Sequence, residues 1–228
     1  MSLRLNSNKM NEKIWAVIPA MDEGEKIGPV IRQTKKYVNN VLVVDDGSTD
    51  NTSEAAKKSG ALVLRHMINL GKGAAVKTGC DFILKKGAEK IILLDSDGQH
   101  DPKEIPNFLD ALENADIVFG YRKFDENMPL VFKIGNNFIN FVAKVLYGIR
   151  LKDTQSGYRA FTNYAYRKIR WTANDYSMES EMIANMAKKK LRYKQIPIKT
   201  IYSEKYKGTT VMDGVKIVLN MLMWRMKG

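Results

Sequence analysis

The stretch Ile91-Ile92-Leu93-Leu94-Asp95-Ser96-Asp97-Gly98-Gln99-His100 joins a short apolar run to two carboxylates that stand one residue apart. The apolar run predicts a strand buried on both faces, as in a parallel sheet covered by helices. Open α/β sheets bind ligands in the crevice beyond the carboxyl ends of their strands, where Asp95 and Asp97 can point at one place. Hard cations such as Mg2+ and Mn2+ prefer oxygen ligands, and Mg2+ commonly binds one or two carboxylates together with substrate phosphates. The stretch therefore predicts a site for a metal ion and a diphosphate, and a solvated turn between strand and helix is the simpler alternative.

Short apolar runs alternate with helix-patterned stretches on both sides of this segment, in the order of a βαβ protein. The expected strands are residues 14–18, 41–44, 61–64, 91–94 and 117–119. The expected helices between them are residues 23–37, 52–59, 73–86 and 103–114. The pattern predicts an α/β fold with a mostly parallel sheet flanked by helices.

Polar residues follow the neighbouring strands too. Asp45 and Asp46 end the 41–44 run, and the Gly, Ser and Thr residues after them favour a tight turn that caps the next helix. A cap does not need two carboxylates at the strand end, so the pair can also accept hydrogen bonds from a base or a ribose. The loop Asn69-Leu70-Gly71-Lys72-Gly73 precedes a helix, where its glycines allow a close backbone approach and Lys72 can meet an anion. This loop lacks the Walker A spacing, so by itself it indicates a phosphate site only weakly.

The pattern changes after Gly120, where two long helices with broad apolar faces are expected. The first carries an apolar stripe made of Phe138, Phe141, Val142, Val145 and Leu146. The second, residues 211–226, has few polar positions, several basic residues and Trp224 near its end. Such helices suit a membrane interface, and they equally suit docking on the sheet or on another subunit.

Charge is divided unevenly along the chain, whose net charge is +12 at pH 7. Residues 1–120 carry 16 Lys and Arg against 17 Asp and Glu, whereas residues 121–228 carry 21 against 8. A basic half of this kind attracts nucleic acid, anionic lipid head groups or a phosphorylated substrate. The single cysteine, Cys80, excludes an internal disulfide framework. The polar start resembles no secretory signal, and no run reaches the roughly 18 apolar residues of a spanning helix, so we expect a soluble or peripheral protein.

Five motifs stand in an order that resembles the inverting glycosyltransferases of the GT-A fold, and among them the dolichyl-phosphate and polyprenyl-phosphate sugar synthases. The motifs are residues 18–23 (IPAMDE), 43–52 (VVDDGSTDNT), 69–73 (NLGKG), 95–100 (DSDGQH) and 153–159 (DTQSGYR). The resemblance implies a Rossmann-like GT-A sheet with C-terminal amphipathic helices, in a single domain over residues 10–228. Residues 10–120 would form the half that binds the nucleotide sugar, and residues 121–228 the half that binds the acceptor and faces the membrane.

The resemblance also implies roles for single residues. The nucleotide side would be lined by Pro19, Ala20, Glu23, Asp46, Lys72, Asp95 and Ser96. The metal would be held by Asp95, Asp97 and Gln99, and the acceptor phosphate would meet Arg122, Lys133, Ser156 and a lid residue, Lys207. Asp97 and Arg122 are the two candidate catalytic residues, and Glu181, at the start of a further expected helix over residues 178–190, is a candidate to face the sugar.

The chain departs from the family pattern at two positions. Asp22 stands where relatives usually have Asn, and Gly157 stands where some relatives with phosphate acceptors carry Asp. The Glu-Asp pair that serves as base in relatives acting on sugar hydroxyls is also missing from this sequence. A lipid phosphate needs no strong base, because a phosphate monoester with a second pKa of about 6 is mostly ionised at neutral pH.

These features together predict a metal-dependent inverting hexosyltransferase that uses Mg2+ or Mn2+. The donor would be a nucleotide-diphosphate sugar, with UDP-glucose or UDP-N-acetylglucosamine favoured over GDP-mannose. The acceptor would be dolichyl or another polyprenyl phosphate, met by a peripheral protein at the cytoplasmic face of the membrane. The alternatives are a glycosyltransferase of the same fold with a saccharide acceptor, a nucleotidyltransferase that makes the sugar nucleotide, and a basic nucleic-acid-binding protein. A nucleic-acid partner is not expected, because it would leave the acidic strand ends without a role, and the oligomeric state is open.

Overall fold

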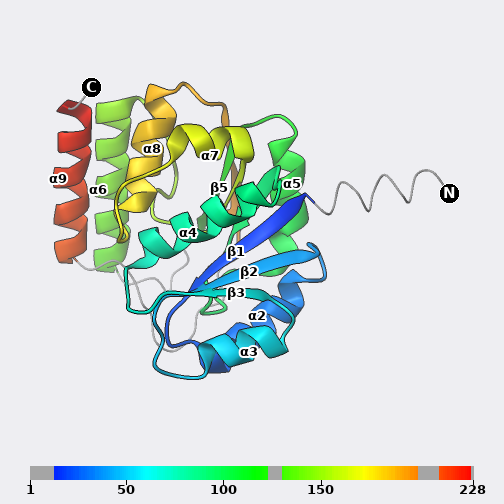
Figure 1. The fold of residues 1–228 in the computed structure, drawn as a ribbon. Helices are drawn as coiled ribbons and strands as arrows, with labels where there is room; N and C mark the ends of the chain where they lie inside the picture. Colours follow the sequence, from blue (N-terminus) through cyan, green and yellow to red (C-terminus); the bar gives the residue numbers. More distant parts are fainter. Residues whose placement is uncertain (1–12, 123–129, 200–210, 227–228) are drawn as a thin grey trace.

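A seven-stranded sheet forms the centre of the computed structural model (Figure 1). The model describes residues 13–122, 130–199 and 211–226, without the side chains of residues 130–134, 211–213 and 215. The strands are β1 (Ile14–Ala20), β2 (Asn40–Asp45), β3 (Leu62–Arg65), β4 (Lys90–Leu93), β5 (Ile117–Arg122), β6 (Arg159–Thr162) and β7 (Tyr193–Ile198). Their order is β3-β2-β1-β4-β6-β5-β7, and β6 runs antiparallel to both of its neighbours while the other pairs are parallel. The predicted α/β class with a mostly parallel sheet is confirmed.

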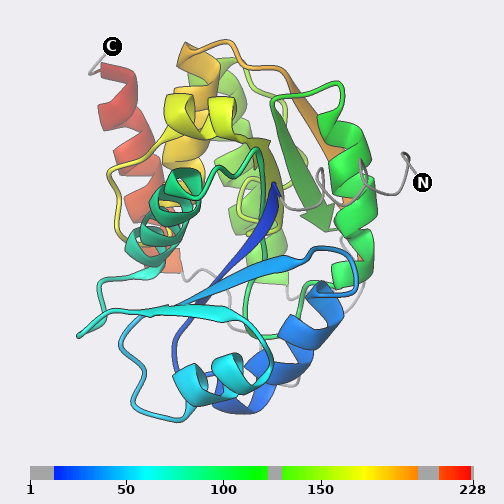
Figure 2. The same cartoon turned by 45° about the vertical axis from the view of Figure 1, so that its right-hand side comes forward.

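Helices cover both faces of this sheet (Figures 1 and 2). They are α2 (Gly24–Thr34), α3 (Thr52–Lys58), α4 (Lys72–Lys85), α5 (Ile105–Leu112), α6 (Leu130–Tyr147), α7 (Asn163–Ile169), α8 (Met178–Lys188) and α9 (Val211–Met226). A short 3-10 turn, Pro102–Glu104, leads into α5. The helices expected from the sequence lie within a few residues of these bounds, so their prediction is confirmed.

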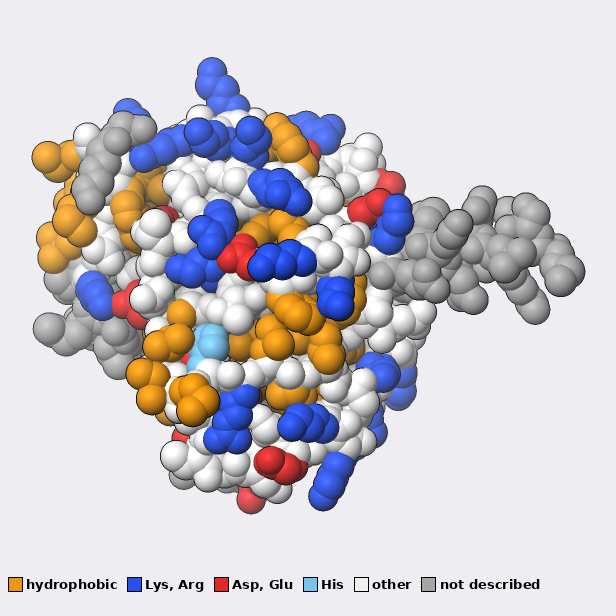
Figure 3. Space-filling model, in the orientation of Figure 1, with side chains coloured by type: hydrophobic (Ala, Val, Ile, Leu, Met, Phe, Trp, Pro, Cys, Tyr) orange, Lys and Arg blue, Asp and Glu red, His pale blue; other side chains and the backbone are white. Residues whose placement is uncertain are grey.

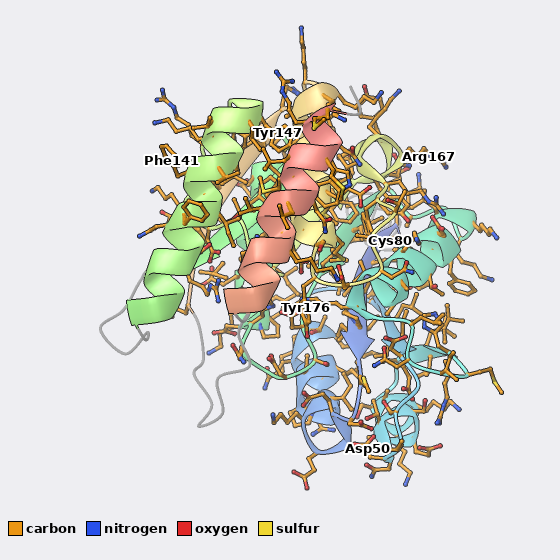
Figure 4. All side chains as sticks on the ribbon, turned by 90° about the vertical axis from the view of Figure 1, so that its left-hand side faces the viewer. Asp50, Cys80, Phe141, Tyr147, Arg167 and Tyr176 are labelled. Carbon is orange, nitrogen blue, oxygen red and sulfur yellow. The ribbon has the colours of Figure 1, made fainter. Side chains whose placement is uncertain are left out.

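The buried residues divide into two cores, one on each face of the sheet. One core joins α4, α7 and α8 to strand residues such as Val17 and Leu93. The other joins α2, α3 and α5 to alternate residues of the same strands, such as Ile18 and Ile92. Because successive side chains of a strand point to opposite faces, strands buried on both faces read as unbroken apolar runs. A third, smaller cluster around Ala143 and Met221 joins α6 to α9, which lie side by side outside α8 (Figure 4).

Three elements were not expected from the sequence: β6, α7 and β7. The strand β6 has four residues and begins with Arg159, a charged residue that hides the apolar pattern of a buried strand. The strand β7 contains Pro197, which a sheet tolerates best at its edge, and β7 is indeed the last strand in the order. Both strands come from the second half of the chain and pair with β4 and β5 of the first half, so the two halves share one sheet.

Candidate active site

The loops after β1 and β2 are joined into one unit by side-chain hydrogen bonds. Pro19 and Ala20, the last residues of β1, are buried beside Val44 and Asp45 of β2. Beyond them, the backbone N–H of Glu23 donates to Thr52 Oγ1, and Asp22 Oδ1 accepts from the backbone N–H of Thr49 at 2.7 Å. Asp22 has a left-handed backbone with φ of 51°, which Asn and Asp adopt more readily than most residues. The departure from Asn at this position therefore preserves the turn.

The two carboxylates at the end of β2 hold the structure of the surrounding loops. Asp45 is fully buried and accepts hydrogen bonds from the backbone of Ser48 and the hydroxyl of Ser53. Asp46 accepts from the backbone N–H groups of Leu70 at 3.0 Å and Gly71 at 2.8 Å, and its Oδ1 lies 2.6 Å from His66 Nδ1. The carboxylate of Asp46 thus shapes the glycine-rich loop before α4, a role that the sequence did not indicate. A contact of Asp46 with a base or ribose stays a prediction.

Lys72, the first residue of α4, lies between two carboxylates. Its Nζ is 2.8 Å from Asp95 Oδ1 and 3.2 Å from Glu179 Oε1. Burial disfavours the charged form of Lys72, but Asp95 and Glu179 outweigh it and raise the pKa of the ammonium. Burial would likewise raise the pKa of Asp95, but the charges of Lys72, His100 and Arg122 lower it to about 2. Asp95 and Lys72 are therefore an ionised pair at neutral pH.

Asp97 stands in the opposite electrostatic situation. Burial, and after it the charge of Asp95 and more weakly that of Glu23, raises the pKa of Asp97 above its ordinary value. His100 packs against this segment: its Nδ1 accepts the backbone N–H of Asp95 at 3.1 Å, and its ring stacks on Tyr158. Burial lowers the pKa of His100. The negative charges around Asp97 are thus not fully balanced by the neighbouring side chains, in agreement with a site that binds a cation.

The residues present fit a divalent cation that is shared with a substrate. In the described part of the chain, no group of three or more His, Cys, Asp or Glu side chains is arranged to hold a metal by itself. Asp95 and Asp97 nevertheless repel one another at the end of β4, and a pair of carboxylates completed by phosphate oxygens is the usual way in which proteins bind Mg2+. Gln99 donates its backbone N–H to Asp97 Oδ1 at 2.9 Å, which turns the loop residues 95–99 around the same point. Ser96, between the two carboxylates, is buried.

Arg122, at the end of β5, is held by a buried carboxylate. Its Nε lies 2.7 Å and its Nη2 3.1 Å from the two oxygens of Asp153, which also accepts from the amide of Asn136 on α6. Burial opposes ionisation of Asp153, but Arg122 outweighs it and lowers the pKa of the carboxyl. The Arg122 side chain keeps 15% of its surface exposed and lies close enough to lower the pKa of Asp95. The predicted anion-binding Arg122 therefore lies near the acidic pair, at the carboxyl ends of the strands.

Of the other predicted acceptor residues, the structure describes the side chain of Ser156 but not those of Lys133 and Lys207. Ser156 is buried, and its Oγ has no hydrogen-bond partner in the part of the chain that the structure describes. Lys133 belongs to α6, but its side chain is outside the described part of the structure, and Lys207 also lies outside the described residues. The two oxygens of Glu181 accept from the backbone of Thr172 and Ala173, whereas Glu179, on the same helical turn, contacts Lys72. A contact of Glu181 with the sugar stays a prediction.

The sequence did not indicate the individual contacts of three residues near the site: Asp153, Arg159 and Glu179. Arg159 is fully buried and donates to the backbone carbonyls of Thr154, Ser156 and Glu179. It therefore fixes the 153–159 loop against the start of α8. The motif DTQSGYR contains Asp153 and Arg159, but Asp153 pairs with Arg122, 31 residues away, and Arg159 reaches Glu179, 20 residues away, so the motif alone does not reveal these contacts.

A mostly parallel sheet with acidic carboxyl-terminal strand ends, interrupted by one antiparallel strand, is the Rossmann-like GT-A architecture of glycosyltransferases. The chain belongs to glycosyl transferase family 2, whose model matches residues 15–170. It is 40% identical to an uncharacterised protein of Methanocaldococcus jannaschii, over 95% of this chain and 94% of that protein. It is 33% identical to the UDP-N-acetylglucosamine–dolichyl-phosphate N-acetylglucosaminyltransferase of Methanococcus voltae, over 93% and 96% of the two chains.

A solved structure supports the fold. The glucosyl-3-phosphoglycerate synthase of Mycobacterium tuberculosis in complex with phosphoglyceric acid aligns with a TM-score of 0.77 at 19% identity, over 98% of this chain and 84% of that one. At 19% identity, this match supports the fold alone. The family resemblance predicted from the five motifs is confirmed.

Proposed function

We propose that this glycosyltransferase moves a hexose from a nucleotide diphosphate to dolichyl or another polyprenyl phosphate, with inversion and with the help of Mg2+ or Mn2+. The observation that carries the proposal is the arrangement of charges at the crevice. The acidic pair Asp95 and Asp97 is accompanied by two cationic side chains: Lys72 on α4, which contacts Asp95, and Arg122 on β5, whose charge lowers the pKa of Asp95. Such a site can receive two anions and hold them together.

The chemistry requires the two anions to be brought close in the crevice. A divalent cation, when bound, would neutralise charge on the leaving diphosphate. Lys72 is placed to meet the donor diphosphate at the start of α4, where the helix N-terminus also favours negative charge. Arg122, which Asp153 holds in place, would orient the acceptor phosphate as the nucleophile. An ionised phosphate attacks without a protein base, in agreement with the missing Glu-Asp pair.

The relative from Methanococcus voltae supports both substrates of the proposal, since its name gives a UDP-sugar donor and a dolichyl-phosphate acceptor. We therefore favour UDP-N-acetylglucosamine or UDP-glucose over GDP-mannose. The division into a nucleotide-sugar half, residues 10–120, and an acceptor half, residues 121–228, belongs to the same proposal.

The exposed faces of α6 and α9 would provide the membrane contact. No helix among the described residues combines the length and hydropathy that crossing a bilayer requires. The α6–α9 face consists of the large exposed apolar residues among the described side chains of these two helices: Phe138, Phe141, Val145, Leu219, Leu222, Met223 and Met226. Apolar side chains gather on that edge of the molecule in Figure 3, and Phe141 is labelled on α6 in Figure 4. The exposed Lys144 and Arg225 on the same helices would favour the anionic lipids of the cytoplasmic leaflet.

A donor panel tests the proposal. The purified protein is incubated with polyprenyl phosphate, Mg2+ or Mn2+ and one radiolabelled sugar nucleotide at a time, and the label extracted into organic solvent is counted. We expect lipid-linked label from a UDP-sugar and none from the Asp97→Ala variant. Full activity of Asp97→Ala would refute the assigned role of the carboxylate pair, and label transferred only to soluble saccharides would refute the acceptor.

A further inference from the structure

The two carboxylates that hold Lys72 differ in their surroundings. The side chain of Asp95 is 26% exposed at the crevice, whereas that of Glu179 is only 3% exposed on the first turn of α8. One oxygen of Glu179, Oε1, lies 3.2 Å from Lys72 Nζ, and the other, Oε2, is buried without a hydrogen-bond partner among the described residues. A buried carboxylate oxygen without a donor is unfavourable, so Oε2 is a vacant acceptor beside the ammonium.

The ammonium of Lys72 has three donors and can therefore serve both carboxylates or turn toward one of them. Gly157 closes the opposite side of the pair: a Cβ there would lie 2.7 Å from Asp95 Oδ2 and 3.0 Å from Lys72 Nζ. Tyr176 lies over the ammonium, with Nζ 5.6 Å from the centre of its ring. Gly157 and Tyr176 thus lie close to the Lys72 ammonium. The second oxygen of Glu179, Oε2, offers a further hydrogen-bond acceptor for this ammonium.

A cation at the end of β4 would compete with Lys72 for Asp95. Asp95 Oδ1 is bonded to Lys72, while the same carboxylate is one of the two that could hold a metal. Two positive charges cannot both lie against one carboxylate without repelling each other. A second carboxylate that retains the ammonium would remove this conflict, because Lys72 stays neutralised when Asp95 turns to the cation.

We propose that Glu179 is a positioning residue that draws Lys72 away from Asp95 and thereby keeps Asp95 available to the divalent cation. This inference rests on the proposed function, which includes the metal. In the cation-bound protein, Glu179 receives Lys72 through both of its oxygens and leaves the ammonium at the edge of the crevice. Without the charge of Glu179, Lys72 remains on Asp95 and blocks the cation.

The test measures the affinity for Mn2+ alone, from the electron paramagnetic resonance signal of free Mn2+ during titration of the intact protein. We expect Glu179→Gln to weaken Mn2+ binding about tenfold and Lys72→Gln to strengthen it. In the Lys72→Gln background, the further change Glu179→Gln should alter the affinity less than about twofold, because the competitor is gone. Glu54→Gln, an exposed change of the same charge on α3, is the matched control and should leave the affinity unchanged.

The double-mutant comparison separates the proposal from a general charge effect. An equal loss of Mn2+ affinity with and without Lys72 would show that Glu179 acts only as a distant negative charge and would overturn the inference, as would an unchanged affinity in Glu179→Gln. Thermal melting reports whether the variants fold. If Glu179→Gln does not fold, the Lys72→Gln variant tests the competition by itself, and an Mn2+ affinity equal to that of wild type would overturn the inference. A wild-type protein that binds no Mn2+, and whose sugar transfer survives chelation, would instead refute the metal and with it the proposed function.

Discussion

Gly157 offers the most specific test of the crevice, because a single methyl group added there collides with two of its charged residues. A Cβ at this position would lie 2.7 Å from Asp95 Oδ2, 2.9 Å from Asp95 Oδ1 and 3.0 Å from Lys72 Nζ. The backbone of Gly157 is outside the left-handed region, so alanine meets no backbone strain and only the space is at issue.

The effect of Gly157→Ala on catalysis follows from these distances. Contact at an ordinary 3.4 Å requires Asp95 or the loop to move by about 0.7 Å from the present 2.7 Å. A misplacement of about 1 Å in an active site can cost about a hundredfold in rate. We expect kcat to fall by about 10- to 100-fold, which corresponds to about 1.4 to 2.7 kcal/mol in the activation barrier.

The assay compares kcat of Gly157→Ala with wild type by extraction of radiolabelled lipid product. Gly135→Ala is the matched control, because a Cβ at Gly135 on α6 meets no atom of the described residues within 4 Å. That variant should keep its activity and gain a little helix stability. A Gly157→Ala variant with the kcat of wild type would refute the view that the Asp95 and Lys72 pair lies at the reacting centre.

The remaining predictions address the acceptor side, the membrane and the loop over α8. Arg122→Gln should raise the KM for polyprenyl phosphate and leave donor affinity, measured by calorimetry, nearly unchanged. It should also lower the unfolding free energy by about 3 kcal/mol, because Asp153 stays buried without its charged partner. A variant of normal stability and KM would contradict both expectations. Replacing Phe141 and Leu222 by Asp should release the protein from anionic vesicles in flotation, whereas unchanged flotation would remove the α6–α9 face from the account. Glu181→Gln should lower the unfolding free energy by about 1 to 2 kcal/mol in urea titration, since it weakens the charged hydrogen bonds to the 172–173 backbone; no loss would show that these bonds do not contribute.

Much of the fold could be predicted from the sequence because its central strands are buried on both faces. The apolar runs 41–44 and 91–94 predict strands from their local sequence alone. In contrast, β6 begins with the buried Arg159 and β7 contains Pro197, so local pattern gives no sign of either strand. Their identity as strands depends on partners elsewhere in the chain.

The same distinction applies to the site. Asp95 and Asp97 could be placed together because they follow one strand, and Lys72 because it opens a helix after a glycine-rich loop. The pairing of Lys72 with Glu179, and of Arg122 with Asp153, depends on how α8 and the 153–159 loop pack against the strand ends. Spacing along the chain contains no record of those contacts, so it does not distinguish Glu179 from Glu181 at the start of α8.

If the acceptor is a lipid phosphate that attacks without a protein base, the enzyme must distinguish polyprenyl phosphate from the unphosphorylated polyprenol. Both lipids are offered in parallel with the same radiolabelled UDP-sugar and Mn2+. We expect transfer to the phosphate, with a sugar phosphodiester identified by phosphorus NMR, and no transfer to the alcohol. Equal transfer to the alcohol, or transfer to a saccharide in preference to both, would contradict this expectation.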